Sequence, residues 1–295
     1  MLCYGPGQAL LSPELERQNP YTENHRTCFP EKDPAPILKK KIKAAFRGIF
    51  DHYHEKLFVG YSNFPKLLKF LKSQVRFEGR EHLQAALEKG KGVILVTGHF
   101  GAVEILPGSL VMNGFPTSMI CRFQTNRLRN SLGRRAESIG LNLLDADTGN
   151  VILTAMKALK AGQILITEVD EFDEWRTDPH RNSNFLNCRM QADRTLELLR
   201  KRSGAEVVTA LVKREGNQEY TCNLTPVGNG TFPATMPISD QCLSVLEDAV
   251  EDYPEQWYQW KKFGKMVKSH FEVENDRQEA GYLAPELGFS VPDQA

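Results

Sequence analysis

The chain has 295 residues, of which 41% are hydrophobic and 25% charged, the balance of an ordinary soluble globular protein. Its 37 basic and 37 acidic residues give a formal net charge of zero, which argues against a nucleic-acid partner. Six scattered cysteines without a Cys-x-x-Cys pair argue against a zinc knuckle or a disulfide scaffold. A chain of this length can bury the core of one sizeable α/β domain.

The N-terminal part of the chain is expected to pass from an irregular lead-in at residues 1–36 to a basic helical region at 37–77. Apolar residues recur there at three- and four-residue steps, and the opposite face is basic. The basic residues of that face are Lys39, Lys40, Lys41, Lys43 and Arg47. Such a face is either solvated or bound to an anionic membrane surface, and this segment alone favours the solvated interpretation.

Alternating strand and helix patterns then predict an α/β domain at residues 78–263, with a largely parallel central sheet flanked by helices. The continuous apolar run at residues 93–97 is typical of a strand buried on both faces. Further strands are predicted at 118–121, 163–169, 206–212 and 220–225. Helices are predicted at 81–89, 127–139, 151–160, 194–202 and 239–251, and a polar tail at 264–295. The functional site is expected at the carboxyl ends of the strands.

No apolar run approaches the roughly 20 residues that cross a bilayer. The N-terminus also lacks the basic start and apolar core of a signal peptide. We therefore expect a cytoplasmic location without a membrane span.

A histidine and a glutamate follow the first buried strand, in the segment Thr-Gly-His-Phe-Gly-Ala-Val-Glu at 97–104. Gly101 lets the backbone turn sharply and leaves space for a substrate. Glu104 could fold back to one ring nitrogen of His99 and leave the other as a base, which is the logic of a catalytic triad without its serine. The spacing is equally compatible with a buried pair that only caps the following helix.

The segment Gly-Lys-Gly-Val-Ile-Leu-Val-Thr-Gly-His-Phe-Gly at 90–101, continued to Glu104, resembles the His-x-x-x-x-Glu motif of the lysophospholipid acyltransferase superfamily. More narrowly, it is similar to the bacterial lauroyl/myristoyl transferases of lipid A synthesis. Three later segments continue the resemblance: Arg-Phe-Gln-Thr-Asn at 122–126, Ser-Gly-Ala at 203–205, and Pro-Glu-Gln-Trp-Tyr-Gln-Trp at 254–260. The first motif alone is weak, but four segments in family order, over roughly residues 45–263, are a strong signal.

The resemblance implies an acyltransferase with a fold like that of the glycerolipid acyltransferases. His99 would be the base that deprotonates an acceptor hydroxyl for attack on a thioester, and Glu104 would orient its ring. Arg122 would hold a phosphate or another anionic group of the acceptor, which suits a guanidinium fork. The resemblance also assigns Asn126 and Asp170 to substrate binding, and Gly101 joins them because it leaves space for a substrate.

The resemblance also implies the partners. The donor would be acyl carrier protein or coenzyme A bearing a fatty chain, and the acceptor a lipid or glycolipid, with a lipid A-type molecule favoured. No metal or other cofactor is expected. The enzyme would work peripherally at the cytoplasmic face of the inner membrane, which moves the interpretation of the basic face towards membrane binding.

Three departures from the family pattern concern the acceptor more than the reaction. Ala-Val at 102–103 replaces Asn-Trp, an acidic stretch at 168–174 replaces Pro-Asp-Gln, and the N-terminal membrane span is missing. One alternative is a metal-dependent hydrolase with His99, Glu104 and the acidic stretch as ligands, but no second histidine has ligand spacing. Another is a catalytically silent lipid- or acyl-carrier-binding protein, against which the intact His99 and Glu104 argue.

Overall fold

The computed structural model describes residues 35–123, 125–147, 149–172, 176–216, 218–260 and 262–263. Asp33–Gln259 form one compact unit, which contains every helix and strand named below. A second unit, Met1–Lys32 with Trp260–Ala295, holds only three described residues. The expected lead-in at 1–36, apart from its last two residues, and the expected tail at 264–295 therefore lie outside the described residues.

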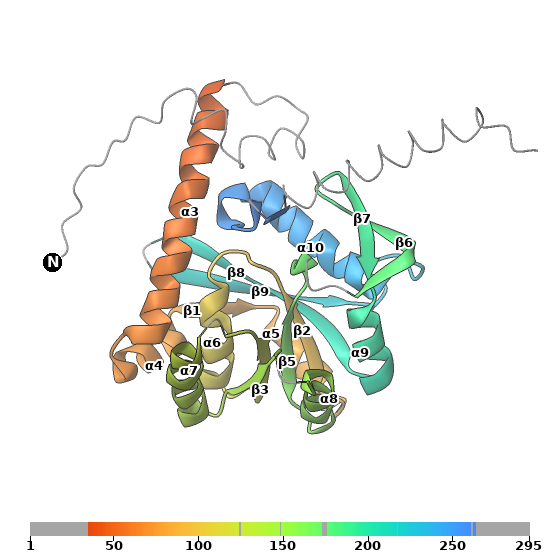
Figure 1. Ribbon diagram of the computed structural model, residues 1–295, viewed down its shortest axis with the longest axis horizontal. Helices are drawn as coiled ribbons and strands as arrows, with labels where there is room; N and C mark the ends of the chain where they lie inside the picture. The colour runs from red at the N-terminus through yellow and green to blue at the C-terminus, as the bar shows by residue number, and fades with distance from the viewer. Residues whose placement is uncertain are drawn as a thin grey trace, which may run out of the picture. The chain divides into compact units, whose positions relative to one another are not determined.

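A seven-stranded sheet forms the centre of the main unit, in the order β1-β9-β8-β2-β5-β3-β4 (Figure 1). Neighbouring strands run parallel, except for the antiparallel pair β8 and β9. The strands are β1 (Val75–Glu78), β2 (Val93–Thr97), β3 (Thr117–Cys121), β4 (Asn142–Asp145), β5 (Ile164–Glu168), β8 (Glu206–Gly216) and β9 (Glu219–Val227). The predicted α/β class with a largely parallel sheet is confirmed.

Helices flank this sheet (Figure 1). They are α3 (Ala35–Tyr61), α4 (Phe64–Ser73), α5 (Arg80–Glu88), α6 (Leu106–Met112), α7 (Asn126–Ile139), α8 (Val151–Lys160), α9 (Thr195–Ser203) and α10 (Ile238–Asp252). There are also two short 3-10 helices: η1 (Val103–Ile105) contains Glu104, and η3 (Pro254–Gln256) accepts a hydrogen bond from the backbone of Gly101. Among the described helices, none is both long and apolar enough to cross a bilayer.

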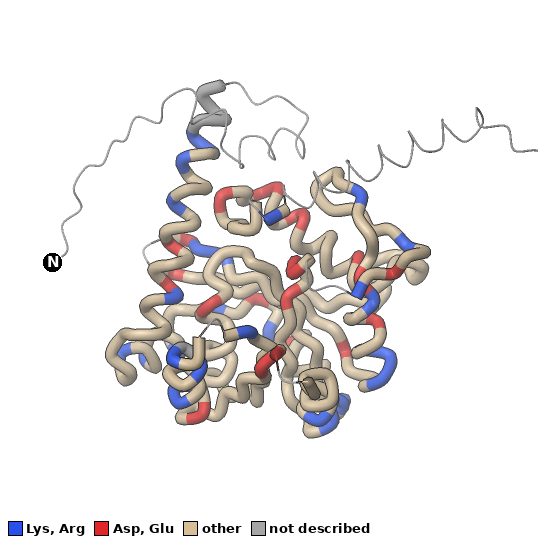
Figure 2. Tube along the Cα trace, in the orientation of Figure 1, with Lys and Arg blue, Asp and Glu red and all other residues tan. Residues whose placement is uncertain are grey.

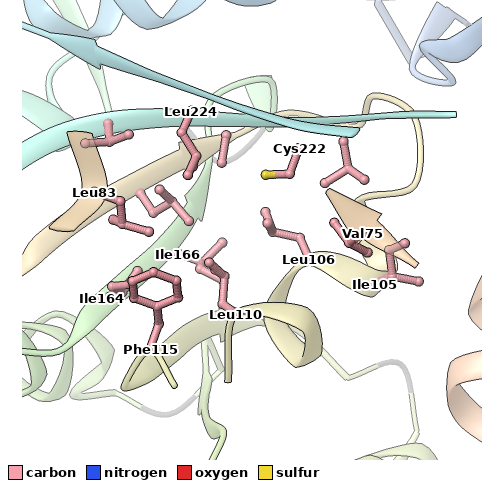
Figure 3. Packing of buried hydrophobic residues seen from close by; sticks show 14 of the residues in the cluster. Val75, Leu83, Ile105, Leu106, Leu110, Phe115, Ile164, Ile166, Cys222 and Leu224 are labelled. Atoms are coloured by element: carbon pink, nitrogen blue, oxygen red, sulfur yellow. The ribbon is translucent and has the colours of Figure 1, made fainter. Parts of the chain in front are cut away.

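One face of the sheet packs against α4, α5 and α6 through a single hydrophobic cluster (Figure 3). Alternate residues of a strand point to the same face, so Val93 and Leu95 of β2 contribute together to this cluster. Leu83 of α5 and Leu106 of α6 are fully buried against them. The cluster fixes β2, and hence the point at which the chain leaves the sheet towards His99.

The boundary predicted at residue 78 falls at the end of β1, which pairs with β9. Leu67 and Leu71 of α4 belong to the same core as the strands. Elements on both sides of the predicted boundary thus pack in one unit. Whether the region 37–77 is a separate functional domain stays a prediction.

The sequence did not predict the antiparallel hairpin of β6 (Thr177–Phe185) and β7 (Cys188–Asp193). Two-residue hairpin turns need positive φ angles, and Asn-Gly is their usual signal. Here Leu186 and Asn187 take that conformation, with φ angles of 50° and 58°. A leucine in the turn hides the signal, because leucine is not a usual turn residue and its side chain is fully buried.

Candidate active site

The register of two neighbouring strands brings His99 and Asp170 together. Strands β2 and β5 are parallel, and their last paired residues are Thr97 and Glu168. His99 and Asp170 each lie two residues further along the chain, at the same carboxyl edge of the sheet. The site predicted at the carboxyl ends of the strands is therefore assembled from the loops that follow β2 and β5.

Asp170 is fully buried and holds the ring of His99. Its Oδ1 accepts a hydrogen bond from His99 Nδ1 at 2.9 Å. Its Oδ2 accepts from the backbone N–H of His99 at 2.9 Å and from Trp257 Nε1 at 2.8 Å. An ionised carboxylate only accepts, so Nδ1 carries a proton and the ring's orientation is fixed.

The other ring nitrogen, Nε2, faces two more carboxylates. Glu171 Oε1 lies 3.0 Å and Glu168 Oε2 3.7 Å from it. Burial lowers the pKa of His99, but the charges of Asp170 and Glu168 and the hydrogen bonds with Asp170 and Glu171 together hold this pKa well above its usual value. Burial raises the pKa of Glu168 to about 7, against the opposite effect of His99. The carboxylates around the ring therefore favour its protonated form, and the neutral ring is the form that can accept a proton.

The aromatic rings of Tyr258 and His52 lie beside the candidate site. Tyr258 presents its ring to the edge of His99, with centroids 5.3 Å apart, and stacks on His52 at 3.8 Å. Burial, followed by the charges of nearby carboxylates including Glu104, holds the pKa of Tyr258 well above its usual value. Burial, and then the charge of Lys56, lowers the pKa of His52 to about 3. Both side chains are therefore neutral at physiological pH.

Glu104 lies in the 3-10 helix η1 and points towards α3 instead of back to His99. Its carboxylate lies 3.8 Å from His52 Nε2 and 3.4 Å from Lys56 Nζ. Among the described residues, Glu104 forms no hydrogen bond or ion pair with His99. The ring contact that the spacing suggested for Glu104 is made by Asp170, and a catalytic role for Glu104 stays a prediction.

Gly101 shapes the loop that carries His99. Its φ is +56°, and a Cβ added there would lie 1.8 Å from the carbonyl oxygen of Val212. Its backbone N–H donates to Gln256 O at 2.9 Å, and its carbonyl accepts from Arg214 Nη2 at 2.5 Å. Arg214 is in turn held by two bonds to Glu55 at 2.7 and 2.8 Å. These contacts give Gly101 a structural role, while substrate binding at this residue stays a prediction.

Gly101→Ala is expected to destabilise the fold by a few kcal/mol, because the new methyl group meets backbone in a conformation that alanine rarely adopts. Thermal unfolding followed by circular dichroism would measure this loss. Gly133→Ala is the matched control, because a Cβ there meets no atom within 4 Å and Gly133 lies inside α7. That control should be neutral or stabilised by up to about 1 kcal/mol. Equal melting temperatures for the two variants would contradict the assignment.

Arg122 and Asn126 lie at the carboxyl end of β3, on the same edge of the sheet as His99. Arg122 is half-exposed and pairs with Asp147, with 2.9 Å between Nε and Oδ1. Asn126 is exposed and begins α7. Because β5 separates β3 from β2, the two residues follow a strand that does not adjoin the strand before His99, and their predicted binding roles stay predictions.

The site also contains donors of the kind that hold metal ions. One ligand atom each from His99, Glu168 and Glu171 lie within 4.8 Å of one another. Glu104, which belongs to the ligand set of the hydrolase alternative, is outside this group in the described part of the chain. Sequence reasoning gave Glu168 and Glu171 no role beyond that acidic stretch, because it could not place these two side chains beside the ring of His99.

A family model for bacterial lipid A biosynthesis acyltransferases matches residues 14–262. A comparison with curated proteins gives no match. The family match spans most of the chain and includes His99, Glu104, Arg122 and the closing Pro-Glu-Gln-Trp segment. It also covers the whole of the sheet and the helices around it. The chain therefore belongs to the bacterial lipid A biosynthesis acyltransferase family.

Proposed function

We propose that the protein transfers a fatty acyl chain from an acyl thioester to a hydroxyl of a lipid or glycolipid, with His99 as the base. Family membership supports acyl transfer. The observation that carries the mechanism is the ring of His99, fixed at Nδ1 by buried Asp170, with Nε2 on the opposite side of the ring. This is the arrangement of a positioned general base with its orienting carboxylate.

In the proposed reaction, the acceptor hydroxyl displaces the carboxylate of Glu171 from Nε2 of the neutral ring. His99 Nε2 takes the hydroxyl proton while the oxygen attacks the thioester carbonyl. The tetrahedral intermediate then collapses, the carbon–sulfur bond breaks, and the departing thiolate takes the proton back from Nε2. Asp170 stabilises the imidazolium between the two steps. The charge of Glu104 also raises the pKa values of Glu168 and Tyr258. In the proposed mechanism, Glu104 adds negative electrostatic potential to the site from farther away than Asp170.

The proposed donor is acyl carrier protein or coenzyme A bearing a fatty chain, and the favoured acceptor is a lipid A-type molecule. Mass spectrometry of lipids from a strain with and without the protein tests this directly. Lipid species that differ by one acyl chain should appear only with the active protein. Identical lipid profiles, together with no transfer from either donor class in purified assays, would contradict the proposal.

We propose that α3 carries the protein to the membrane surface, as the basic N-terminal region suggested. Its exposed apolar side chains are spaced by about one helical turn: Phe46, Phe50, Tyr53, Leu57 and Tyr61. Basic residues lie along the same helix (Figure 2). Of these, Lys40, Lys43 and Arg47 are exposed. Anionic lipid would supply the counter-charge, and the apolar stripe would enter the headgroup region.

The protein should sediment with anionic vesicles at low salt and be released at high salt, because each basic residue contributes about 1 kcal/mol that salt screens. Leu57→Ser should weaken this binding. Leu153→Ser on α8 is its matched control, since the two leucines are 58% and 57% exposed. Equal effects of both substitutions, or no binding at any salt concentration, would contradict the role proposed for α3.

Arg122 is proposed to bind a phosphate of the acceptor, because it follows the carboxyl end of β3 and its side chain is half-exposed. Arg122→Lys keeps the charge but loses the two-pronged donor, so we expect KM for a phosphorylated acceptor to rise while KM for the thioester holds. Arg134→Lys on the exposed face of α7 is the control. An equal rise in KM for both substrates would instead indicate that Arg122 has a structural role, through its ion pair with Asp147.

A further inference from the structure

Three carboxylates surround the ring of His99 among the described residues. Asp170 lies on the Nδ1 side, and Glu171 and Glu168 lie on the Nε2 side. Within the described residues, His99 is the only ionic partner of Asp170 and of Glu168. Three carboxylates thus converge on one imidazole, and acidic groups gathered in this way are commonly held by a cation.

We propose that His99, Glu168 and Glu171 form a binding site for a divalent transition-metal ion, held by Nε2 and one oxygen of each carboxylate. Ligand atoms about 2.0–2.2 Å from a tetrahedral zinc ion lie roughly 3.4 Å apart. The oxygens of Glu171 and Glu168 lie 3.0 and 3.7 Å from Nε2, on either side of that value. All three ligand atoms lie within 4.8 Å of one another.

Asp170 completes the arrangement from behind the ring. A histidine that binds a metal almost always donates its other N–H to a carboxylate or carbonyl, which fixes the tautomer and the ring orientation. His99 does so through Nδ1, and Trp257 and the backbone of His99 in turn hold Asp170. The contact that prepares His99 as a base therefore also prepares it as a ligand.

The donor set indicates which ions bind. An imidazole nitrogen with two carboxylates suits zinc and its transition-metal neighbours, whereas Ca²⁺ and Mg²⁺ prefer oxygen ligands alone. Three protein ligands leave a fourth tetrahedral position open. Zinc is therefore the first probe, cobalt its spectroscopic substitute, and Mg²⁺ the negative control.

Occupation of this site has a consequence for acyl transfer, which rests on the proposed function. A metal on Nε2 uses the lone pair that would take the acceptor's proton. Metal and acceptor therefore compete, and zinc should inhibit transfer at the same concentrations at which it binds. Added chelator should restore activity.

The binding test uses the full chain, stripped with chelator and titrated with zinc in a calorimeter. We expect one zinc per chain at this site and at least tenfold weaker binding in Glu168→Gln and in Glu171→Gln. Asp170→Asn should weaken binding by about 10–100-fold. Glu247→Gln is the control, a partly buried carboxylate on α10 that bonds the backbone of Leu186. Melting temperatures would confirm that each variant is folded.

Cobalt distinguishes this site from binding at cysteines. The expected spectrum has the visible bands of nitrogen and oxygen ligands and lacks a thiolate charge-transfer band. A protein that transfers acyl chains but binds no zinc, or binds it equally in Glu168→Gln and Glu171→Gln, would overturn the metal site and leave the proposed function standing. Zinc binding lost in those two variants, in a protein that transfers no acyl chain when metal-free, would support the site and contradict the proposed function.

Discussion

His99→Ala is expected to lower acyl-transfer turnover by about 10²–10⁴-fold, the range that a positioned general base contributes. A lipid hydroxyl is a poor nucleophile at neutral pH, so the base must be in place while the bond to the carbonyl carbon forms. The substitution removes the ring and leaves Asp170 with its bonds from Trp257 and the backbone N–H of residue 99. The fold should therefore survive, although with some loss of stability.

Initial rates with a fatty acyl thioester and a lipid acceptor would measure this effect, with donor binding measured separately. His82→Ala provides the matched control, because His82 is exposed on α5, away from the loops after β2 and β5. It should leave turnover unchanged. A folded His99→Ala protein with near-normal transfer would remove His99 from the mechanism.

The central strand and the position of His99 were predictable because their signals are local. A continuous apolar run ends at Thr97, and two residues later a histidine stands between two glycines. All five residues of β2 are buried, as such a run implies. The short strands β1 and β4 escaped prediction because each has four residues and lies at an edge of the sheet, where polar and apolar side chains mix.

The partner of His99 was harder to predict because its identity depends on which strands are neighbours. Asp170 reaches the ring because β5 pairs with β2. A sequence shows that two strands exist, but not that they lie side by side. Glu104 was the nearer candidate along the chain, yet the packing of α3 brings His52 and Lys56 to its carboxylate. Spacing along the chain singled out His99 and could not choose between the two carboxylates.

Asp170→Asn tests whether Asp170 or Glu104 orients His99. We expect this substitution to lower turnover by about 10²–10⁴-fold. Trp257 Nε1 and the backbone N–H of His99 both donate to Oδ2, so the asparagine must place its oxygen there. Its NH₂ group then faces Nδ1, which can only accept, and the ring proton moves to Nε2. The lone pair needed for the acceptor hydroxyl is lost. The same change of tautomer is how an Asp→Asn substitution disables serine-protease triads.

Glu104→Gln should cost less, about tenfold or below, because it removes charge near the site without touching either ring nitrogen. The same initial-rate assay on both single variants tests this order. Since Asp170 acts only through His99, the double variant with His99→Ala should be hardly slower than His99→Ala alone, whereas independent contributions would multiply. A loss in Glu104→Gln as large as that in Asp170→Asn would return the orienting role to Glu104. It would also mean that the loop after β2 rearranges when substrate binds, so that Glu104 exchanges Lys56 for the ring of His99.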